Sequence, residues 1–165
     1  MGVFDKNLCD CCVCPMQCVL EQLVGVGSEI QNVAIIFNFA GATIDDITDV
    51  NNFNLFTIRS GSGRRFIIPI CQVIGVELFN SQPINLNINL KPVRKDSKGE
   101  CSCCEDPATD VLKRMIGERV NVRFSNASRT GTIMNVGEGI VILSDDPLIQ
   151  TILSTCNIQA IEVLT

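Results

Sequence analysis

The residues with the most chemistry to offer are the cysteines, of which the chain has ten. Thiols at this density form disulfides, bind metal ions or carry out redox reactions. Cys71 and Cys156 stand apart, and we interpret them as small buried apolar residues. The others form two short clusters: Cys9, Cys11, Cys12, Cys14 and Cys18, and then Cys101, Cys103 and Cys104.

Disulfide cross-linking is the first chemistry that the two clusters suit. Cys11 and Cys12 are adjacent, as are Cys103 and Cys104. Neighbouring Cα atoms lie about 3.8 Å apart, below the usual disulfide range of roughly 4.4–6.8 Å. Each of these cysteines therefore needs a partner elsewhere. We predict that all the clustered cysteines serve disulfides between segments or between molecules.

A zinc site is the alternative. Cys9 and Cys12 show the two-residue gap that lets two thiolates reach one zinc ion, and so do Cys101 and Cys104. Together the four would make the zinc site of a cytoplasmic adaptor module. Because 88 residues lie between Cys12 and Cys101, only a tandem architecture could bring the pairs together. Apart from this zinc ion we expect no cofactor.

A thiol–disulfide redox protein is the third hypothesis. Cys11 and Cys14 form a CxxC motif that precedes Pro15. No βαβ pattern surrounds this motif, as it would in a thioredoxin-like protein.

Other catalytic chemistry has few candidates, because the chain has no His, Trp or Tyr. This excludes Ser-His-Asp and Cys-His catalysis. The formal charge of −5 argues against electrostatic binding to nucleic acid or anionic lipid. The longest uncharged apolar stretch has 15 residues, and a membrane-spanning helix needs about 20. We expect no enzyme, no nucleic-acid or membrane partner, and synthesis in a cytoplasm without a signal peptide.

The chain is a tandem repeat. Cys9, Cys11, Cys12 and Pro15 match Cys101, Cys103, Cys104 and Pro107, each 92 residues further on. The same shift relates Gly25 to Gly117 and Ile30 to Val122. After small insertions, Ile47 and Val50 match Ile133 and Val136, and Leu55 matches Val141. Finally Cys71 and the eight residues after it match the nine residues that begin at Cys156, with Glu77 on Glu162.

Each half therefore predicts the same elements: a cysteine cluster, a short amphipathic helix and about five short strands. We expect helices near Met16–Val24 and Ala108–Ile116, ended by Gly25 and Gly117. The strands of the first half are expected near Glu29–Phe37, Thr43–Val50, Asn54–Arg59, Arg64–Ile70 and Gln72–Phe79. Those of the second are expected near Arg119–Phe124, Gly131–Val136, Ile140–Ser144, Ile149–Leu153 and Asn157–Leu164.

This order of elements resembles the Sm-like form of the SH3-like barrel. The phrases that carry the resemblance are Leu23–Ile30 and Met115–Val122, which follow the pattern Leu-Ile-Gly-x-x-Val-x-Val loosely. The predicted fold is mainly β, with two tandem small Sm-like barrels, each preceded by a cysteine cluster and a short α-helix. The predicted divisions are residues 1–79, a bridging strand and charged linker at 80–100, and residues 101–165.

The linker alternates apolar residues with asparagine, with a period of two, over residues 83–90. This pattern indicates a half-buried strand with one apolar face, made of Ile84, Leu86, Ile88 and Leu90. The strand would either bridge the two barrels or add to the sheet of a neighbouring molecule.

The chain resembles the small cysteine-rich spore-surface proteins of endospore-forming Firmicutes. The phrases that carry this resemblance are Cys9–Gly25 and Phe66–Cys71. The resemblance implies a structural, self-assembling, non-enzymatic protein of the spore coat or exosporium. It also implies synthesis in the reducing mother-cell cytoplasm, followed by oxidation and cross-linking around the spore. The implied partners are copies of the chain itself and other spore-surface proteins.

Overall fold

The structure is a computed structural model, and it describes residues 10–37, 41–44, 46–51, 54–59, 62–93, 106–125 and 127–164. Side chains are outside this description at residues 10–12, 41–44, 58, 59 and 106. The fold is mainly β, as expected. No helix in the described part of the chain is long and apolar enough to cross a membrane.

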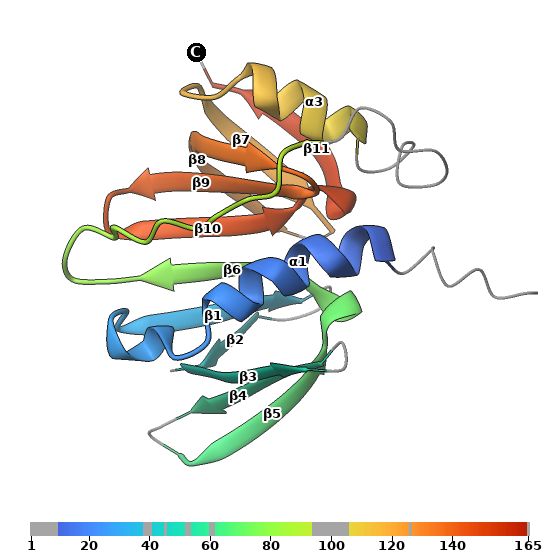
Figure 1. The fold of residues 1–165 in the computed structure, drawn as a ribbon. Coiled ribbons are helices and arrows are strands. Elements are labelled where there is room, and N and C mark those ends of the chain that lie inside the picture. The colour runs from blue at the N-terminus through green and yellow to red at the C-terminus, as the bar shows by residue number, and fades with distance from the viewer. Residues whose placement is uncertain are drawn as a thin grey trace, which may run out of the picture.

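In the described part of the chain, helices α1 and α3 lie against the strands (Figure 1). Helix α1 spans Asp10–Gln22 and helix α3 spans Asp106–Arg114. The first helix begins earlier than predicted, so Cys11, Cys12 and Cys14 lie within α1 instead of before it, while Cys18 lies within the helix as predicted. A proline inside a helix removes one intrahelical hydrogen bond. The helix nevertheless continues through Pro15, which is buried.

Most strands lie close to their predicted positions, but the single strand predicted near Thr43–Val50 is two strands, Gly41–Ile44 and Asp46–Asn51. The first half contains β1 (Asn32–Phe37), β2 (Gly41–Ile44), β3 (Asp46–Asn51), β4 (Asn54–Arg59), β5 (Arg64–Pro69) and β6 (Val73–Phe79). The second contains β7 (Arg119–Phe124), β8 (Ala127–Gly137), β9 (Ile140–Asp146), β10 (Ile149–Ser154) and β11 (Ile158–Val163). The described chain also contains the short 3-10 helices η1 (Val26–Ser28), η2 (Ile70–Gln72) and η3 (Thr155–Asn157).

The sequence suggested two separate barrels, but the strands do not form two separate closed barrels. They form an eight-stranded sheet in the order β11-β7-β8-β9-β10-β6-β1-β2 and a three-stranded sheet in the order β3-β4-β5. The physical reason is that β6 pairs with β1 of its own half on one side and with β10 of the other half on its second side. A strand has only two hydrogen-bonding edges, so β6 has none left with which to close a barrel.

The internal repeat is confirmed at the level of strand register. Residue numbers in β5, η2 and β6 differ by 85 from those in β10, η3 and β11, as in the pairs 64 and 149 or 73 and 158. Even a bulge is repeated. Phe37 pairs with Val73 just after Ile36 pairs with Gly75. In the second unit, Phe124 pairs with Ile158 just after Arg123 pairs with Ala160. We call the halves the first unit (10–79) and the second unit (106–164).

The helix ends are repeated as well. Gly25 and Gly117 both have positive φ angles, 77° and 92°. Each follows its helix and donates its N–H to a bent strand, Gly25 to the Ile47 carbonyl and Gly117 to the Ile133 carbonyl. One predicted match is wrong: Ile30 does not correspond to Val122. The additional turn η1 follows Gly25, so Val33, not Ile30, begins the buried positions of β1.

The two hydrophobic cores cross the boundary between the units. Val33, Ile35 and Val76 lie in the core under α1, and the second unit adds Ile140, Ile142 and Ile152 to it. The core under α3 in turn includes Ile36 and Ile74 of the first unit. A unit of this size buries little apolar surface alone, so sharing side chains stabilises both.

Candidate functional site

The most developed polar arrangement in the described chain lies where the two units meet. We call the β6–β10 ladder the joint; it pairs Phe79 with Ile149 at one end and Gly75 with Leu153 at the other. The Glu77 side chain of the first unit is nearly buried there, and two groups of the second unit donate to it. Arg129 Nε lies 2.5 Å from Glu77 Oε2, and Thr151 Oγ1 lies 3.0 Å from the same oxygen.

This arrangement links the two units through one carboxylate. A buried carboxylate is costly unless it is paired and hydrogen-bonded. Glu77 is satisfied only when the second unit supplies Arg129 and Thr151. The sequence singled out Glu77 as an acid shared with Glu162, but it gave no indication of Arg129 or Thr151, because they come from other strands.

Gly75 is the second feature of the joint, and it allows the backbones of β6 and β10 to lie close together. A Cβ atom added there would lie 2.5 Å from the Ile152 carbonyl oxygen and 2.6 Å from Leu153 Cδ2. Real Cβ atoms do not approach neighbours this closely, so only glycine fits without a shift of the two strands. Strand glycines often mark such a close approach of backbones. The second unit has Ala160 at the equivalent position of β11.

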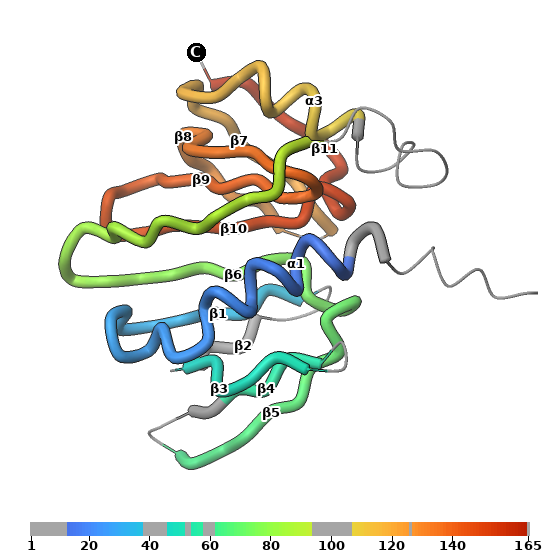
Figure 2. Tube along the Cα trace, viewed as in Figure 1, coloured from blue at the N-terminus to red at the C-terminus, as the bar shows by residue number. Residues whose placement is uncertain are grey.

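A strap of extended chain, residues 80–93, fastens the joint from one side; Figure 2 shows it running from β6 across β10 and β9 toward α3. It makes no strand ladder, unlike the predicted bridging strand. Gln22 on α1 receives the Asn89 N–H and donates to the Asn89 carbonyl. At the other unit, Ile84 N–H donates to the Pro147 carbonyl and Glu138 N–H donates to the Lys91 carbonyl.

The predicted apolar face of this segment points inward. Ile88 is buried, with 6% exposed, in the core under α1. Ile84, Leu86 and Leu90 pack against the same core and are half-buried, whereas the asparagines between them are exposed. These four residues therefore share one face, as predicted, and here they hold the two units of one chain together.

Several of the predicted cross-linking cysteines fall outside the described side chains. These are Cys9, Cys11, Cys12, Cys101, Cys103 and Cys104, and the alternative zinc site of Cys9, Cys12, Cys101 and Cys104 lies outside them too. Of the two that are described, Cys14 and Cys18 are half-buried on α1, and Cys18 is a free thiol. Among the described residues, no group of three or more Cys, Asp or Glu is placed to hold a metal ion.

Cys71 and Cys156 differ from the prediction that both are buried apolar residues. They occupy the same position in the repeat, in η2 and η3 before the last strand of each unit. Cys71 is an exposed free thiol. Cys156 is half-buried and disulfide-bonded. The short 3-10 helix turns the chain between two strands, which brings both positions to the surface.

A shallow pocket of about 380 Å³ lies between the strap and strands β8, β9 and β10. Its rim includes Asn85, Met134 and Asp145. Asp145 is ion-paired with Arg119. The Ser144 hydroxyl donates to the carbonyls of Asp146 and Ile149. The Ser144 hydroxyl is thus held by main-chain carbonyls at the edge of the pocket.

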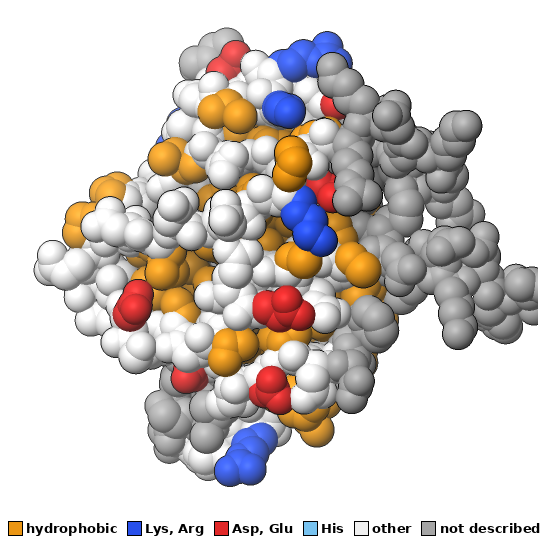
Figure 3. Space-filling view, in the orientation of Figure 1, with side chains coloured by type: hydrophobic (Ala, Val, Ile, Leu, Met, Phe, Trp, Pro, Cys, Tyr) orange, Lys and Arg blue, Asp and Glu red, His pale blue; other side chains and the backbone are white. Residues whose placement is uncertain are grey.

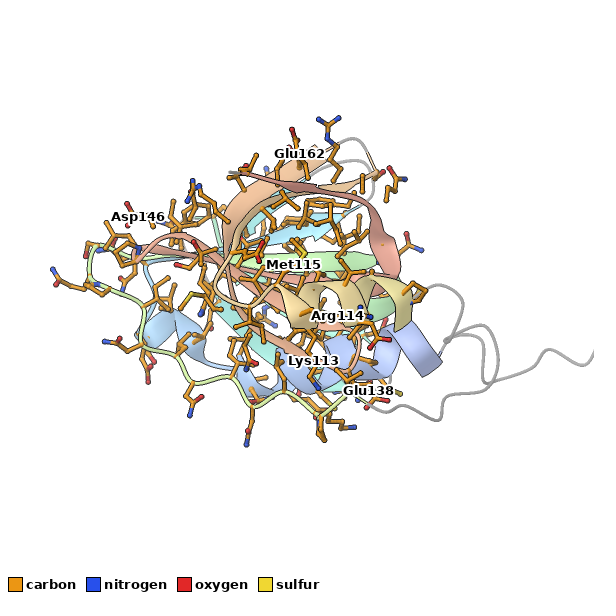
Figure 4. The ribbon with its side chains drawn as sticks, turned by 90° about the horizontal axis from the view of Figure 1, so that it is seen from above. Lys113, Arg114, Met115, Glu138, Asp146 and Glu162 are labelled. Carbon is orange, nitrogen blue, oxygen red and sulfur yellow. The ribbon has the colours of Figure 1, made fainter. Side chains whose placement is uncertain are left out.

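Glu162 shows what the repeated acid does where no second unit faces it. Its carboxylate accepts from Asn121 Nδ2 at 3.1 Å and from Arg123 at 3.4 Å, both within its own unit. The hydrogen bond from Asn121, then the hydrogen bond and charge of Arg123, hold the pKa of Glu162 below its usual value. In the view from above, Glu162 lies on the outer rim, away from Lys113 and Arg114 of α3 (Figure 4).

On the face that carries α1 and the strap, the described basic and acidic side chains are interspersed among polar and hydrophobic ones (Figure 3). The surface seen there thus presents no field of one sign. Comparison with known proteins adds no family: the chain matches no protein-family model, no curated protein and no solved structure.

Proposed function

We propose that this chain is a structural, non-enzymatic protein that assembles with copies of itself in a spore surface layer, and that disulfides lock the assembly. The observation that carries this proposal is the contrast between its two equivalent cysteines. Cys156 is disulfide-bonded, whereas Cys71 presents a free thiol at the surface. The chain thus has one position of the repeat in a covalent link and leaves the other accessible for a further link.

The physics of such a lock has two parts. Contacts between strands and shared cores set the geometry, and a disulfide then makes dissociation slow until a reductant is added. Each new disulfide forms from two thiols, which together lose two protons and two electrons to an oxidant such as molecular oxygen or oxidised glutathione. The resemblance to spore-surface proteins supports the location, because these proteins are made in a reducing compartment and oxidised later.

We further propose that each unit is an opened Sm-like barrel. In the second unit the strand order is β11-β7-β8-β9-β10, with η3 before the last strand. The first unit repeats it as β6-β1-β2 and β3-β4-β5, where β2 and β3 together correspond to the long strand β8. A leading helix, this order and a 3-10 turn before the last strand support the assignment.

The test is an intact mass of the full chain under native, non-reducing conditions, repeated with reductant. We expect covalent multimers that collapse to 18.0 kDa on reduction. Cys71→Ser should reduce their amount, and Cys11→Ser combined with Cys12→Ser should reduce it further while the melting temperature stays near that of the reduced wild type. A monomer or dimer that carries the additional mass of a metal ion would overturn the proposal in favour of a zinc module.

A further inference from the structure

The eight-stranded sheet ends in β11 and β2, and the three-stranded sheet ends in β3 and β5. Of these outer strands, β5 and β11 are the equivalents of the two strands that pair in the joint. Among the described strands, β5 pairs only with β4, and β11 pairs only with β7. The free side of an outer strand presents N–H and C=O groups that can pair with another chain. Three of the large hydrophobic side chains exposed at the surface lie on these two strands: Phe66 and Ile67 on β5, 38% and 65% exposed, and Val163 on β11, 51% exposed.

The internal repeat indicates which strand can pair with each of these two outer strands. Strand β5 is the equivalent of β10, and β11 is the equivalent of β6, with residue numbers that differ by 85. Inside the chain, β10 and β6 are already paired antiparallel in the joint. The two ends of one molecule are therefore the two halves of the same contact. They cannot meet within one chain, because they lie at opposite ends of the arrangement (Figure 1).

We propose that β5 of one copy pairs antiparallel with β11 of a second copy, in the register of the joint. The inference rests on the proposed self-assembly and specifies its contact. Since Gln150 pairs with Leu78 and Thr151 with Glu77, Arg65 would face Val163 and Phe66 would face Glu162. Each contact uses one end of each copy, so it is head-to-tail and repeats into rings or filaments.

Charge favours this pairing over pairing of like ends. Strand β5 carries Arg64 and Arg65, and β11 carries Glu162. Two β5 strands paired in parallel would bring four arginines together, and like charges opposite each other destabilise a ladder; paired antiparallel, neither arginine pair would face an acidic residue. In the head-to-tail register, Arg64 lies diagonally across from Glu162, within the reach of a long side chain.

The outer contact is weaker than the joint at one position. Ala160 stands where the joint has Gly75, and its Cβ atom would meet the carbonyl of Ile67, as a Cβ on Gly75 would meet that of Ile152. The copies must separate slightly there, so we expect an association that depends on concentration. Pro69 on β5 does not oppose the pairing, because its equivalent, Ser154, lies outside the β6–β10 ladder.

The experiment blocks one end at a time, in reductant, and measures mass by sedimentation and native mass spectrometry. Phe66→Glu places two carboxylates opposite each other and blocks the β5 end. Val163→Arg places two guanidinium groups opposite each other and blocks the β11 end. Wild type should form higher oligomers, and each variant alone should associate at least about tenfold more weakly. An equimolar mixture of the two variants should form a 1:1 dimer that grows no further. Each variant keeps one unblocked outer strand, and the dimer uses both of them.

Met134→Arg is the matched control, because Met134 is 55% exposed but lies on the interior strand β8; it should associate as wild type does. Ala160→Gly should tighten association. The melting temperature of each variant verifies its fold. A single variant that associates alone as tightly as the wild type would overturn head-to-tail pairing, and so would a monomeric wild type in reductant. Covalent multimers in the non-reduced wild type would still support the disulfide lock, so the two proposals fail separately.

Discussion

The joint and the two outer edges use the same strand positions, yet only the joint is completed within one chain. In the joint, Gly75 allows the strands to approach, and Glu77 is held by two groups of the other unit. At the outer edges the equivalent positions are Ala160 and an exposed Glu162 that is bound within its own unit. The outer strand β5 also carries Arg64 and Arg65, where β10 has Ile149 and Gln150.

The difference teaches that a repeated strand order does not by itself make a permanent contact. Three additions distinguish the joint from the edges: a glycine, a buried acid with its partners, and the strap. Charged residues on an outer strand are a common way to keep it from pairing indiscriminately. The same backbone positions are thus permanently paired at the joint and selective at the outer edges.

A substitution that disrupts the packing of the strap should cause the largest loss of stability. Ile88→Asp places a carboxylate in the core under α1, where Ile88 is 6% exposed, and it should lower the free energy of unfolding by about 3 kcal/mol or more. Asn87→Asp, on the exposed side of the same segment, should change it by less than about 0.5 kcal/mol. Urea unfolding of both variants measures the difference; equal losses would contradict the inward orientation of the strap.

Gly75→Val should cause the next largest loss of stability. The added side chain meets the Ile152 carbonyl and the Leu153 side chain, so the variant should lose about 1–3 kcal/mol of stability through overpacking. Ala160→Val makes a comparable addition at the equivalent position on the outer strand β11, where the residue is exposed, and should leave monomer stability nearly unchanged. Thermal unfolding in reductant compares the two. A stable Gly75→Val variant would mean that the joint is looser than its geometry indicates.

Substitutions of the two equivalent acids, Glu77 and Glu162, should cause the smallest losses of stability. They compare the same position of the repeat at the joint and at the outer edge. Glu77→Gln leaves Arg129 without its charged partner and should cost about 1–2 kcal/mol, whereas Glu162→Gln should cost little at neutral pH because it is exposed. The pKa of Glu162 is lowered in the folded state. Its contribution is therefore present above the unfolded value of about 4.3 and is lost as pH falls through the lower folded value.

Unfolding of both variants and the wild type between about pH 3 and 7 measures this dependence. The small gap between wild type and Glu162→Gln should close in acid. A stability difference that grows in acid would contradict the stabilising interactions of the ionised Glu162 carboxylate.

The sequence predicted the mainly β fold, the positions of most strands and the repeat that relates Cys71 to Cys156. These follow from local patterns: alternation of apolar residues, glycines that end helices, and a long match of one half to the other. The predictions were wrong where a distant contact decides. Helix α1 continues through Pro15, Cys71 is exposed at a turn, and the strands join in shared sheets in place of two barrels.

By itself, the sequence determined which residues are equivalent and which face of each strand is apolar, because side-chain alternation is local to a strand. It even placed Ile84, Leu86, Ile88 and Leu90 on one face. Only the tertiary structure decided that β6 pairs with β10 and that β5 and β11 are outer strands of their sheets. The physical reason is that the backbone groups of a strand edge are nearly the same for every sequence. The choice of partner depends on close approaches such as that at Gly75 and on partners such as Arg129, which come from distant parts of the chain.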